Sequence, residues 1–158
     1  MNNSKILRSK EREMKMIDVK VILKDGAIMP SYAKEGDSGV DLFCKEDVTI
    51  PVQARGFVVK TGISLELPKG YELQVRPKSG VSVRTPLRVV LGTVDEGYRG
   101  EIGVIVDNLS DEEIKIEKGK AIAQGVLNKV PKMAFVKVEE LSSTDRGQGG
   151  FGSTGRGI

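Results

Sequence analysis

Short runs rich in valine and isoleucine recur along this chain of 158 residues. In several runs apolar and polar positions alternate with a period of two, as at Ile63, Leu65 and Leu67 and again at Ile114 and Ile116. This alternation is typical of a β-strand with one buried face. The runs predict strands over residues 19–23, 57–67, 71–75, 88–94, 102–108, 113–116, 121–130 and 134–138.

Glycine and proline separate the predicted strands. The chain has 19 Gly and 6 Pro, and many lie in turn-like segments such as Lys24-Asp25-Gly26 and Lys118-Gly119. No window of helical length keeps an apolar stripe, except a weak one over residues 5–14. A chain of this length with many short strands predicts one all-β domain, built as a sandwich, a jelly roll or a small barrel.

Composition restricts the chemistry that this chain can perform. Hydrophobic residues make up 39% of the sequence but aromatic residues only 4%, so we expect an aliphatic core. Histidine is absent, which excludes Ser-His-Asp and Cys-His catalysis and histidine zinc sites. The one cysteine, Cys44, cannot form an intramolecular disulfide and fits a reducing compartment. Catalysis must therefore use carboxylates, Lys, Arg, Tyr, hydroxyls or the backbone.

The net charge of +3 is concentrated at the start of the chain. Residues 1–16 hold five Lys or Arg and two Glu, and the remainder holds 20 residues of each sign. We interpret residues 1–16 as a flexible basic leader, and we expect no nucleic-acid partner because the rest of the chain is neutral. No apolar run approaches the ~18 residues of a membrane span, so we expect a cytoplasmic protein with no membrane partner.

Residues 142–158 form a glycine-rich arm after the predicted β domain at 17–141. Phe151 is the only apolar side chain between Leu141 and Ile158, so the arm cannot build a core of its own. A flexible tail is the simplest interpretation. Against it, the arm also holds Arg146 and the hydroxyls of Ser153 and Thr154. Such groups among glycines suit a phosphate chain, and a phenyl ring offers a face to a base.

Two generic phosphate motifs do not explain the arm. Gly147, Gly149 and Gly152 match G-x-G-x-x-G, but dinucleotide binding needs a strand before this motif and a helix after it, and only six residues follow Gly152. Walker A needs a lysine before the hydroxyl residue, and Ser153 follows Gly152 directly. We therefore expect a phosphate-wrapping arm of another kind.

Two internal segments also hold candidate chemistry. Asp95 and Tyr98 lie between two predicted strands, where an ionised carboxylate can activate water and a phenol ring can pack on a sugar. The alternative is a plain hairpin turn with Tyr98 as a cross-strand packing residue. The segment Lys78-Ser79-Gly80 places a cation beside a hydroxyl, and a helical turn that begins here would face an anion. Its alternative is a solvated basic loop.

Together with two further segments, these residues resemble the trimeric dUTP pyrophosphatases, or dUTPases. The five ordered motifs of that family are matched by residues 38–42 (SGVDL), 78–80 (KSG), 92–101 (GTVDEGYRGE), 119–124 (GKAIAQ) and 146–155 (RGQGGFGSTG). The resemblance covers residues 17–155. It implies a jelly-roll-like β-barrel, a homotrimer and the hydrolysis of dUTP to dUMP and pyrophosphate.

The resemblance also implies roles for individual residues. Asp95 would activate the water that attacks the α-phosphorus, and Tyr98 would stack on the deoxyribose. The backbone before Tyr98, including Val94, would recognise uracil. The phosphates would be held by Lys78, Ser79, Gly80 and Gln124. In the arm, Arg146 would pair with the γ-phosphate, Phe151 would cover the uracil, and Gly152, Ser153 and Thr154 would close over the nucleotide.

The implied cofactor is Mg²⁺, held mainly by the triphosphate, with Asp41 acting near it through water. Lys78 stands where the family usually has arginine, which replaces a bidentate fork by a point charge. Two other interpretations remain open. A dCTP deaminase shares the fold that the resemblance implies, and a trimeric regulator could use the arm to control a protein partner.

Overall fold

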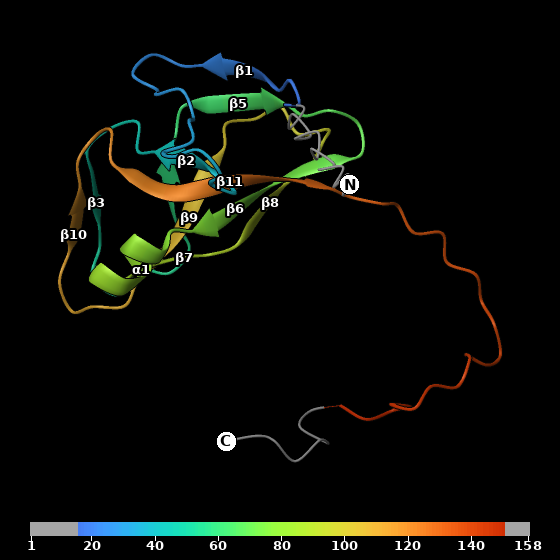
Figure 1. The fold of residues 1–158 in the computed structure, drawn as a ribbon. Coiled ribbons are helices and arrows are strands. Elements are labelled where there is room, and N and C mark those ends of the chain that lie inside the picture. Colours follow the sequence, from blue (N-terminus) through green and yellow to red (C-terminus); the bar gives the residue numbers. More distant parts are fainter. Residues whose placement is uncertain (1–15, 151–158) are drawn as a thin grey trace, which may run out of the picture.

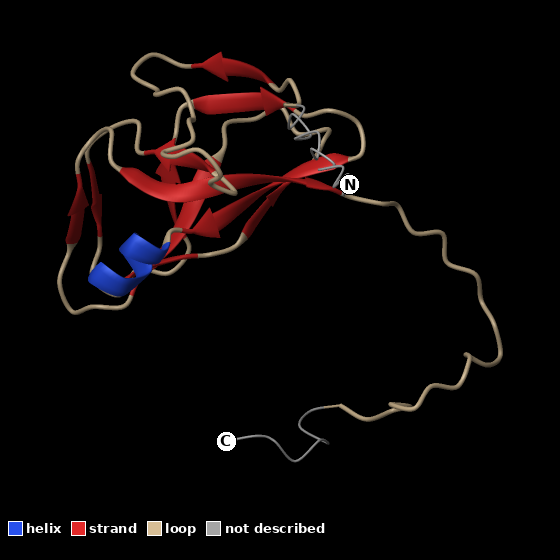
Figure 2. Ribbon diagram, viewed as in Figure 1, coloured by secondary structure: helices blue, strands red, loops and turns tan. Residues whose placement is uncertain are grey.

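The structure is a computed structural model, and it describes residues 16–150. Eleven strands and one helix lie in this range (Figures 1 and 2). They are β1 (Lys20–Leu23), β2 (Val40–Phe43), β3 (Val48–Ile50), β4 (Phe57–Lys60), β5 (Ile63–Glu66), β6 (Tyr71–Pro77), α1 (Ser79–Arg84), β7 (Leu87–Val89), β8 (Gly92–Val94), β9 (Gly103–Asn108), β10 (Ile114–Ile116) and β11 (Ala121–Lys129). The prediction of an all-β domain is confirmed.

The strands form antiparallel sheets that enclose a common core (Figure 1). The largest sheet has four strands in the order β2-β11-β6-β8, and a second has three in the order β4-β9-β7. Two strand pairs, β1 with β5 and β3 with β10, complete the fold. The connection from β8 to β9 therefore crosses from one sheet to the other.

The core is aliphatic, as the composition predicts. In β9 the side chains of Val104 and Val106 are fully buried, whereas Ile105 between them is exposed. The same alternation of buried and exposed residues occurs in β7, and in part of β6 buried residues alternate with half-buried ones. The period of two in the sequence thus reports which face of each strand packs inward.

Two of the predicted strands are each divided in the structure. The run at 57–67 contains β4 and β5, and the chain turns between them at Gly62, whose φ of +73° favours glycine. A Cβ at this position would lie 2.7 Å from the Cβ of Ala27. The run at 88–94 contains β7 and β8, which pair with different strands and belong to different sheets.

The prediction of a strand over residues 134–138 is wrong for the single chain. These residues form no strand, and the chain leaves the barrel after β11 as an extended segment (Figure 1). The side chains of Met133, Phe135, Val136 and Leu141 are 79–90% exposed. A strand needs a neighbouring backbone to accept and donate its hydrogen bonds, and within the described residues this segment has none.

The hydrophobic pattern did not predict the strands β2 and β3. The two strands are only four and three residues long, too short for alternation to stand out. Helix α1 packs beside β7 and realises the helical turn considered for the segment after Lys78. Among residues 16–150, no helix has the length and apolar character needed to cross a membrane.

The fully buried Asn108 joins three segments of the barrel. Its Nδ2 donates to the carbonyl oxygens of Pro51 and Glu112 at 2.9 and 2.7 Å, and its Oδ1 accepts from the N–H and hydroxyl of Ser110. We expect Asn108→Ala to lower the free energy of unfolding by about 2–4 kcal/mol, because it leaves buried polar groups without partners.

Urea denaturation at matched protein concentration measures this loss. Asn128→Ala is the control, since that half-buried side chain donates one bond, to the carbonyl of Val126 at 3.1 Å, and should cost less than about 1 kcal/mol. Equal losses of unfolding free energy in the two variants would contradict the role of Asn108 in joining the three segments.

Candidate functional site

A row of polar residues crosses three strands near the end of β6. In the sheet register Gln124 of β11 lies opposite Asp41 of β2 on one side and Arg76 of β6 on the other. Lys78 follows β6 directly, and Ser79 and Gly80 begin α1. We call Asp41, Lys78, Ser79, Gly80 and Gln124 the Lys78 cluster. Residues from three of the predicted motifs therefore meet here.

Lys78 and Asp41 form an ion pair within this cluster. The Nζ of Lys78 donates to Oδ1 of Asp41, and the two side chains are only 27% and 16% exposed. Gln124 is anchored beside them, because its Nε2 donates to the carbonyl of Pro77 at 2.9 Å. The cluster thus brings a cation, an anion and a fixed amide together at the N-terminus of helix α1. Asp41 and Lys78 are 37 positions apart in the sequence.

The segment Asp95–Glu101, here called the Asp95 loop, connects β8 to β9. Its turn is closed by the N–H of Tyr98, which donates to the carbonyl of Asp95 at 3.0 Å. The carboxylate of Glu96 accepts from the N–H of Gly70, which ties the loop to the turn before β6. The loop joins two sheets, so the alternative of a plain hairpin is wrong.

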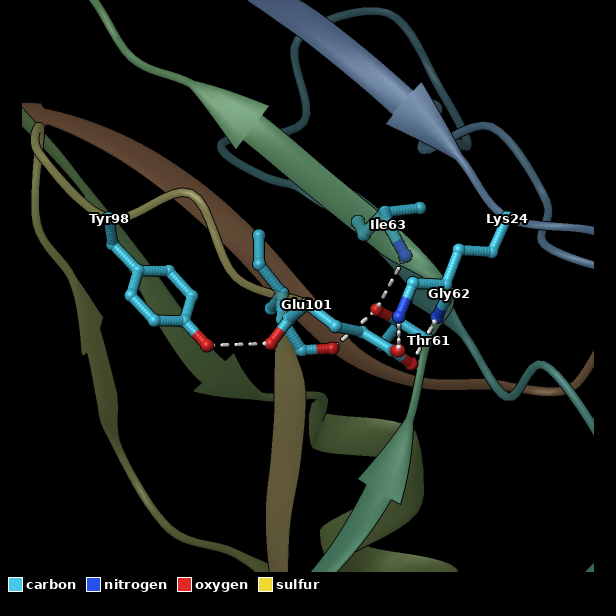
Figure 3. A network of polar contacts seen from close by, with 7 residues as sticks. Lys24, Thr61, Gly62, Ile63, Tyr98 and Glu101 are labelled. Atoms are coloured by element: carbon cyan, nitrogen blue, oxygen red, sulfur yellow. Dashed lines mark hydrogen bonds and ion pairs between the residues drawn. The ribbon is translucent and has the colours of Figure 1, made fainter.

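Tyr98 presents its ring at the surface of this loop. Tyr98 is 47% exposed, and its hydroxyl donates to the carbonyl of Glu101 at 3.0 Å (Figure 3). Asp95 is exposed at the end of β8, whereas the side chain of Val94 before it is buried. The loop therefore offers an exposed carboxylate and an oriented phenol ring within four residues.

Glu101 and Lys24 form an ion pair to which the sequence alone assigns no role. The Nζ of Lys24 donates to Oε2 of Glu101 at 2.6 Å, and the N–H of Gly62 donates to Oε1 at 3.0 Å (Figure 3). The bonded Lys24, aided by Gly62, holds the pKa of Glu101 below its ordinary value of 4.5 against the opposing effect of partial burial. These partners are 77 and 39 positions away, which one sequence cannot reveal.

The Asp95 loop and the Lys78 cluster lie at opposite ends of β6. Val94 pairs with Leu73 near the start of β6, and Lys78 follows five residues further along. At about 3.3 Å per residue this places the two groups roughly 17 Å apart in one chain. The chain therefore does not bring its own Asp95 loop and Lys78 cluster together.

The arm is described as far as Gly150. Arg146 is exposed, and its Nε donates to the carbonyl of Gly149 at 2.9 Å within a local turn. Along its described part, the arm stays away from the barrel (Figure 1). The predicted ligands Phe151, Gly152, Ser153 and Thr154 lie outside the described residues.

Two further observations concern the reactivity of Cys44 and the side chains that could bind a metal ion. Cys44 is fully buried, and burial raises the pKa of its thiol above the ordinary 9.0, so the thiol is protonated at neutral pH. Within residues 16–150, no three or more acidic, Cys or His side chains converge on a point where they could hold a metal ion.

Comparison with known proteins identifies the family. The dUTPase family model matches residues 25–155. A deoxyuridine 5'-triphosphate nucleotidohydrolase of Hydrogenobaculum sp. (strain Y04AAS1) is 50% identical over 135 residues, which span 84% of this chain and 94% of that protein. The enzyme of the same name from Helicobacter pylori (strain P12) is 51% identical over 131 residues, 82% of this chain and 90% of that protein.

Solved structures agree with these relatives. The Staphylococcus bacteriophage 80alpha dUTPase, solved with dUPNHPP, matches with a TM-score of 0.80 and 30% identity over 87% of this chain and 98% of its own. A mutant dUTPase of phage phi11 of S. aureus, solved with a structural Mg(II) ion, matches with a TM-score of 0.72 and 26% identity over 78% of this chain and 98% of its own. With a family model that covers most of its length and relatives about half identical to it, this chain belongs to the dUTPase family.

Proposed function

We propose that this protein hydrolyses dUTP to dUMP and pyrophosphate. The observation that carries the proposal is the Asp95 loop, which presents an exposed carboxylate and an oriented tyrosine ring at the junction of two sheets. Membership of the dUTPase family and the likeness to a dUTPase solved with dUPNHPP support the choice of substrate.

In the proposed reaction Asp95 accepts a proton from water as the water oxygen attacks the α-phosphorus. A new phosphorus–oxygen bond forms, the bond from the α-phosphorus to the bridging oxygen of the β-phosphate breaks, and pyrophosphate leaves with that electron pair. No covalent intermediate with the enzyme is needed. An exposed carboxylate at the end of a rigid strand is suited to hold and deprotonate a water.

The phosphate chain would be held by Lys78, the hydroxyl of Ser79, the backbone of Gly80, and Gln124, with Arg146 on the γ-phosphate. Lys78 is a single charge without the bidentate fork of arginine, so Gln124 and the arm would fix the phosphate geometry. In the free chain the charge of Lys78 is met by Asp41. A phosphate that binds there exchanges one anionic partner of Lys78 for another.

The residues present fit Mg²⁺ held chiefly by the substrate. Asp41 is the one carboxylate of the Lys78 cluster, and a hard oxygen donor of this kind can bond the water shell that Mg²⁺ retains. When bound, the ion would neutralise charge on the phosphates as pyrophosphate departs. The phi11 dUTPase, which was solved with Mg(II), supports this choice of metal.

Selection of the base and sugar would come from the Asp95 loop and the arm. The backbone at Val94 and beyond would pair with uracil, and cytosine would leave buried donors or acceptors unpaired. The ring of Tyr98 would pack on the deoxyribose and exclude a 2′-hydroxyl. Phe151, Gly152, Ser153 and Thr154 of the arm would close over the nucleotide.

We infer that the active sites are shared between the subunits of a homotrimer. In dUTP the α-phosphate is attached directly to the sugar, yet Tyr98 and Lys78 of one chain lie at opposite ends of β6. A second copy that supplies the Lys78 cluster resolves this separation. The exposed apolar side chains at Met133, Phe135, Val136 and Leu141 support an assembly in which this segment packs on a neighbour.

Release of pyrophosphate from dUTP, UTP, dCTP and dTTP tests the proposed activity. We expect strong preference for dUTP and loss of activity when EDTA removes Mg²⁺, with recovery when Mg²⁺ is restored. Ammonia is measured in parallel, because a dCTP deaminase would release it from dCTP. Comparable rates on all four nucleotides would contradict the proposal.

Asp95→Asn tests the proposed base. The amide keeps the size of the side chain but cannot accept the proton, so we expect kcat to fall by at least ~10²-fold. Binding of a non-hydrolysable dUTP analogue, measured by calorimetry, should change little. A parallel loss of binding would make Asp95 a binding residue.

Mixed assemblies test the shared site. One variant is Asp95→Asn with an intact arm, and the other ends at Leu141 and keeps Asp95. Each alone should be inactive, and co-expression should restore about a quarter of the sites if the base and the arm come from different chains of a cyclic oligomer. No recovery in mixed trimers verified by mass spectrometry would rule out sharing of these two parts.

A further inference from the structure

The ring of Tyr98 is held by two contacts and not by burial. Tyr98 is almost half exposed, and its hydroxyl donates to the backbone oxygen of Glu101 at 3.0 Å. The ring also lies over Gly100, where a Cβ would come within 2.3 Å of the phenol oxygen. The orientation of the ring therefore depends on the position of the carbonyl of Glu101.

The peptide unit that contains this carbonyl is held on both sides, because its own N–H, that of Ile102, donates to the carbonyl of Ile63, and the side chain of Glu101 holds the Cα end. The two carboxylate oxygens of Glu101 accept bonds from Lys24 and from the N–H of Gly62 (Figure 3). Both donors belong to segments that are themselves joined, since the N–H of Lys24 donates to the carbonyl of Gly62 at 2.8 Å. Glu101 thus fastens the Asp95 loop to the turn between β4 and β5.

The backbone after Glu101 is attached to the same turn. The N–H of Ile102 donates to the carbonyl of Ile63 at 2.8 Å, and the hydroxyl of Thr61 donates to the carbonyl of Ile102. The carboxylate of Glu101 is only 19% exposed, so its bonds to Lys24 and Gly62 are partly shielded from water. Removing the carboxylate would leave the peptide unit of the Glu101 carbonyl held on one side only, by the N–H of Ile102, and would leave β9 in place.

We propose that Glu101 is a positioning residue for sugar selection, acting through the ring of Tyr98. The proposal rests on the proposed function, in which that ring packs on deoxyribose and excludes a 2′-hydroxyl. Without the carboxylate, the carbonyl of Glu101 moves more freely and the ring follows it. A looser ring admits ribose, so discrimination between dUTP and UTP falls.

The test compares kcat/KM for dUTP and UTP in Glu101→Ala and in a matched control. We expect Glu101→Ala to narrow the dUTP/UTP ratio by about tenfold, the scale of one well-placed hydrogen bond to a charged group. Glu101→Gln keeps an oxygen that can accept from the N–H of Gly62 but loses the charge that pairs with Lys24. We therefore expect its dUTP/UTP ratio to lie between those of the wild type and Glu101→Ala.

Asp107→Ala is the control because Asp107 makes the equivalent bridge at the other end of β9. Its carboxylate accepts from the N–H of Gly56 at 2.8 Å and lies 3.6 Å from the guanidinium of Arg55. Gly56, like Gly62, has a positive φ. This variant removes a similar bridge far from Tyr98, and we expect it to leave the dUTP/UTP ratio unchanged.

A double-mutant comparison tests whether Glu101 acts through Tyr98. Tyr98→Phe removes only the hydroxyl that reaches the carbonyl of Glu101, and it should narrow the ratio by itself. The double variant should narrow the ratio no further than the larger single effect. Additive effects of the two substitutions on the dUTP/UTP ratio would contradict the coupling of Glu101 to Tyr98.

Failure of the inference is distinct from failure of the proposed function. If the wild type prefers dUTP but Glu101→Ala lowers both kcat/KM values by the same factor, the role is structural only and the inference falls. If the wild type does not prefer dUTP, the result contradicts the proposed function, and with it the role proposed for Glu101. Should Glu101→Ala not fold, judged by circular dichroism, Glu101→Gln and Lys24→Met decide, and an unchanged ratio in both overturns the inference.

Discussion

The hydrogen-bonded ladders on both sides of β6 are the constraint on which the site depends. All seven residues of β6 pair with β11 on one side, and residues 73–75 of β6 pair with β8 on the other side. A central strand cannot shorten or shift its register without breaking several backbone bonds and moving its side chains to the wrong face. The distance between its two ends is therefore a fixed property of the fold. The Asp95 loop and the Lys78 cluster are attached to those ends.

Under the proposed function, this rigid spacing would place the parts of one site in different copies of the chain. A nucleotide whose sugar lies against Tyr98 requires phosphate ligands nearby, and the chain keeps its own Lys78 at the far end of β6. In the proposed cyclic assembly, one repeated contact between copies would complete every site. The extended segment after β11 leaves apolar side chains uncovered, so the same contact would also remove apolar surface from water.

The element types followed largely from local pattern, and the departures have physical causes. β9 alternates buried Val104 with exposed Ile105, and such a period of two depends on near neighbours alone. The break at Gly62 was hidden because apolar residues recur within a few positions on both sides of this single turn glycine, at Val59 and at Ile63. Residues 134–138 are also rich in apolar residues but form no strand, since strand formation also needs a partner backbone.

The sequence by itself determined the all-β class, the aliphatic core, the absence of histidine and disulfide chemistry, and the pairing of Asp95 with Tyr98 in one short loop. Only the tertiary structure decided that Lys78 meets Asp41, that Lys24 and Gly62 hold Glu101, and that the two clusters lie at opposite ends of β6. The reason is the range of the interactions. Strand alternation and turns arise from adjacent residues, whereas these contacts join residues 37 to 77 positions apart through the register of the sheets.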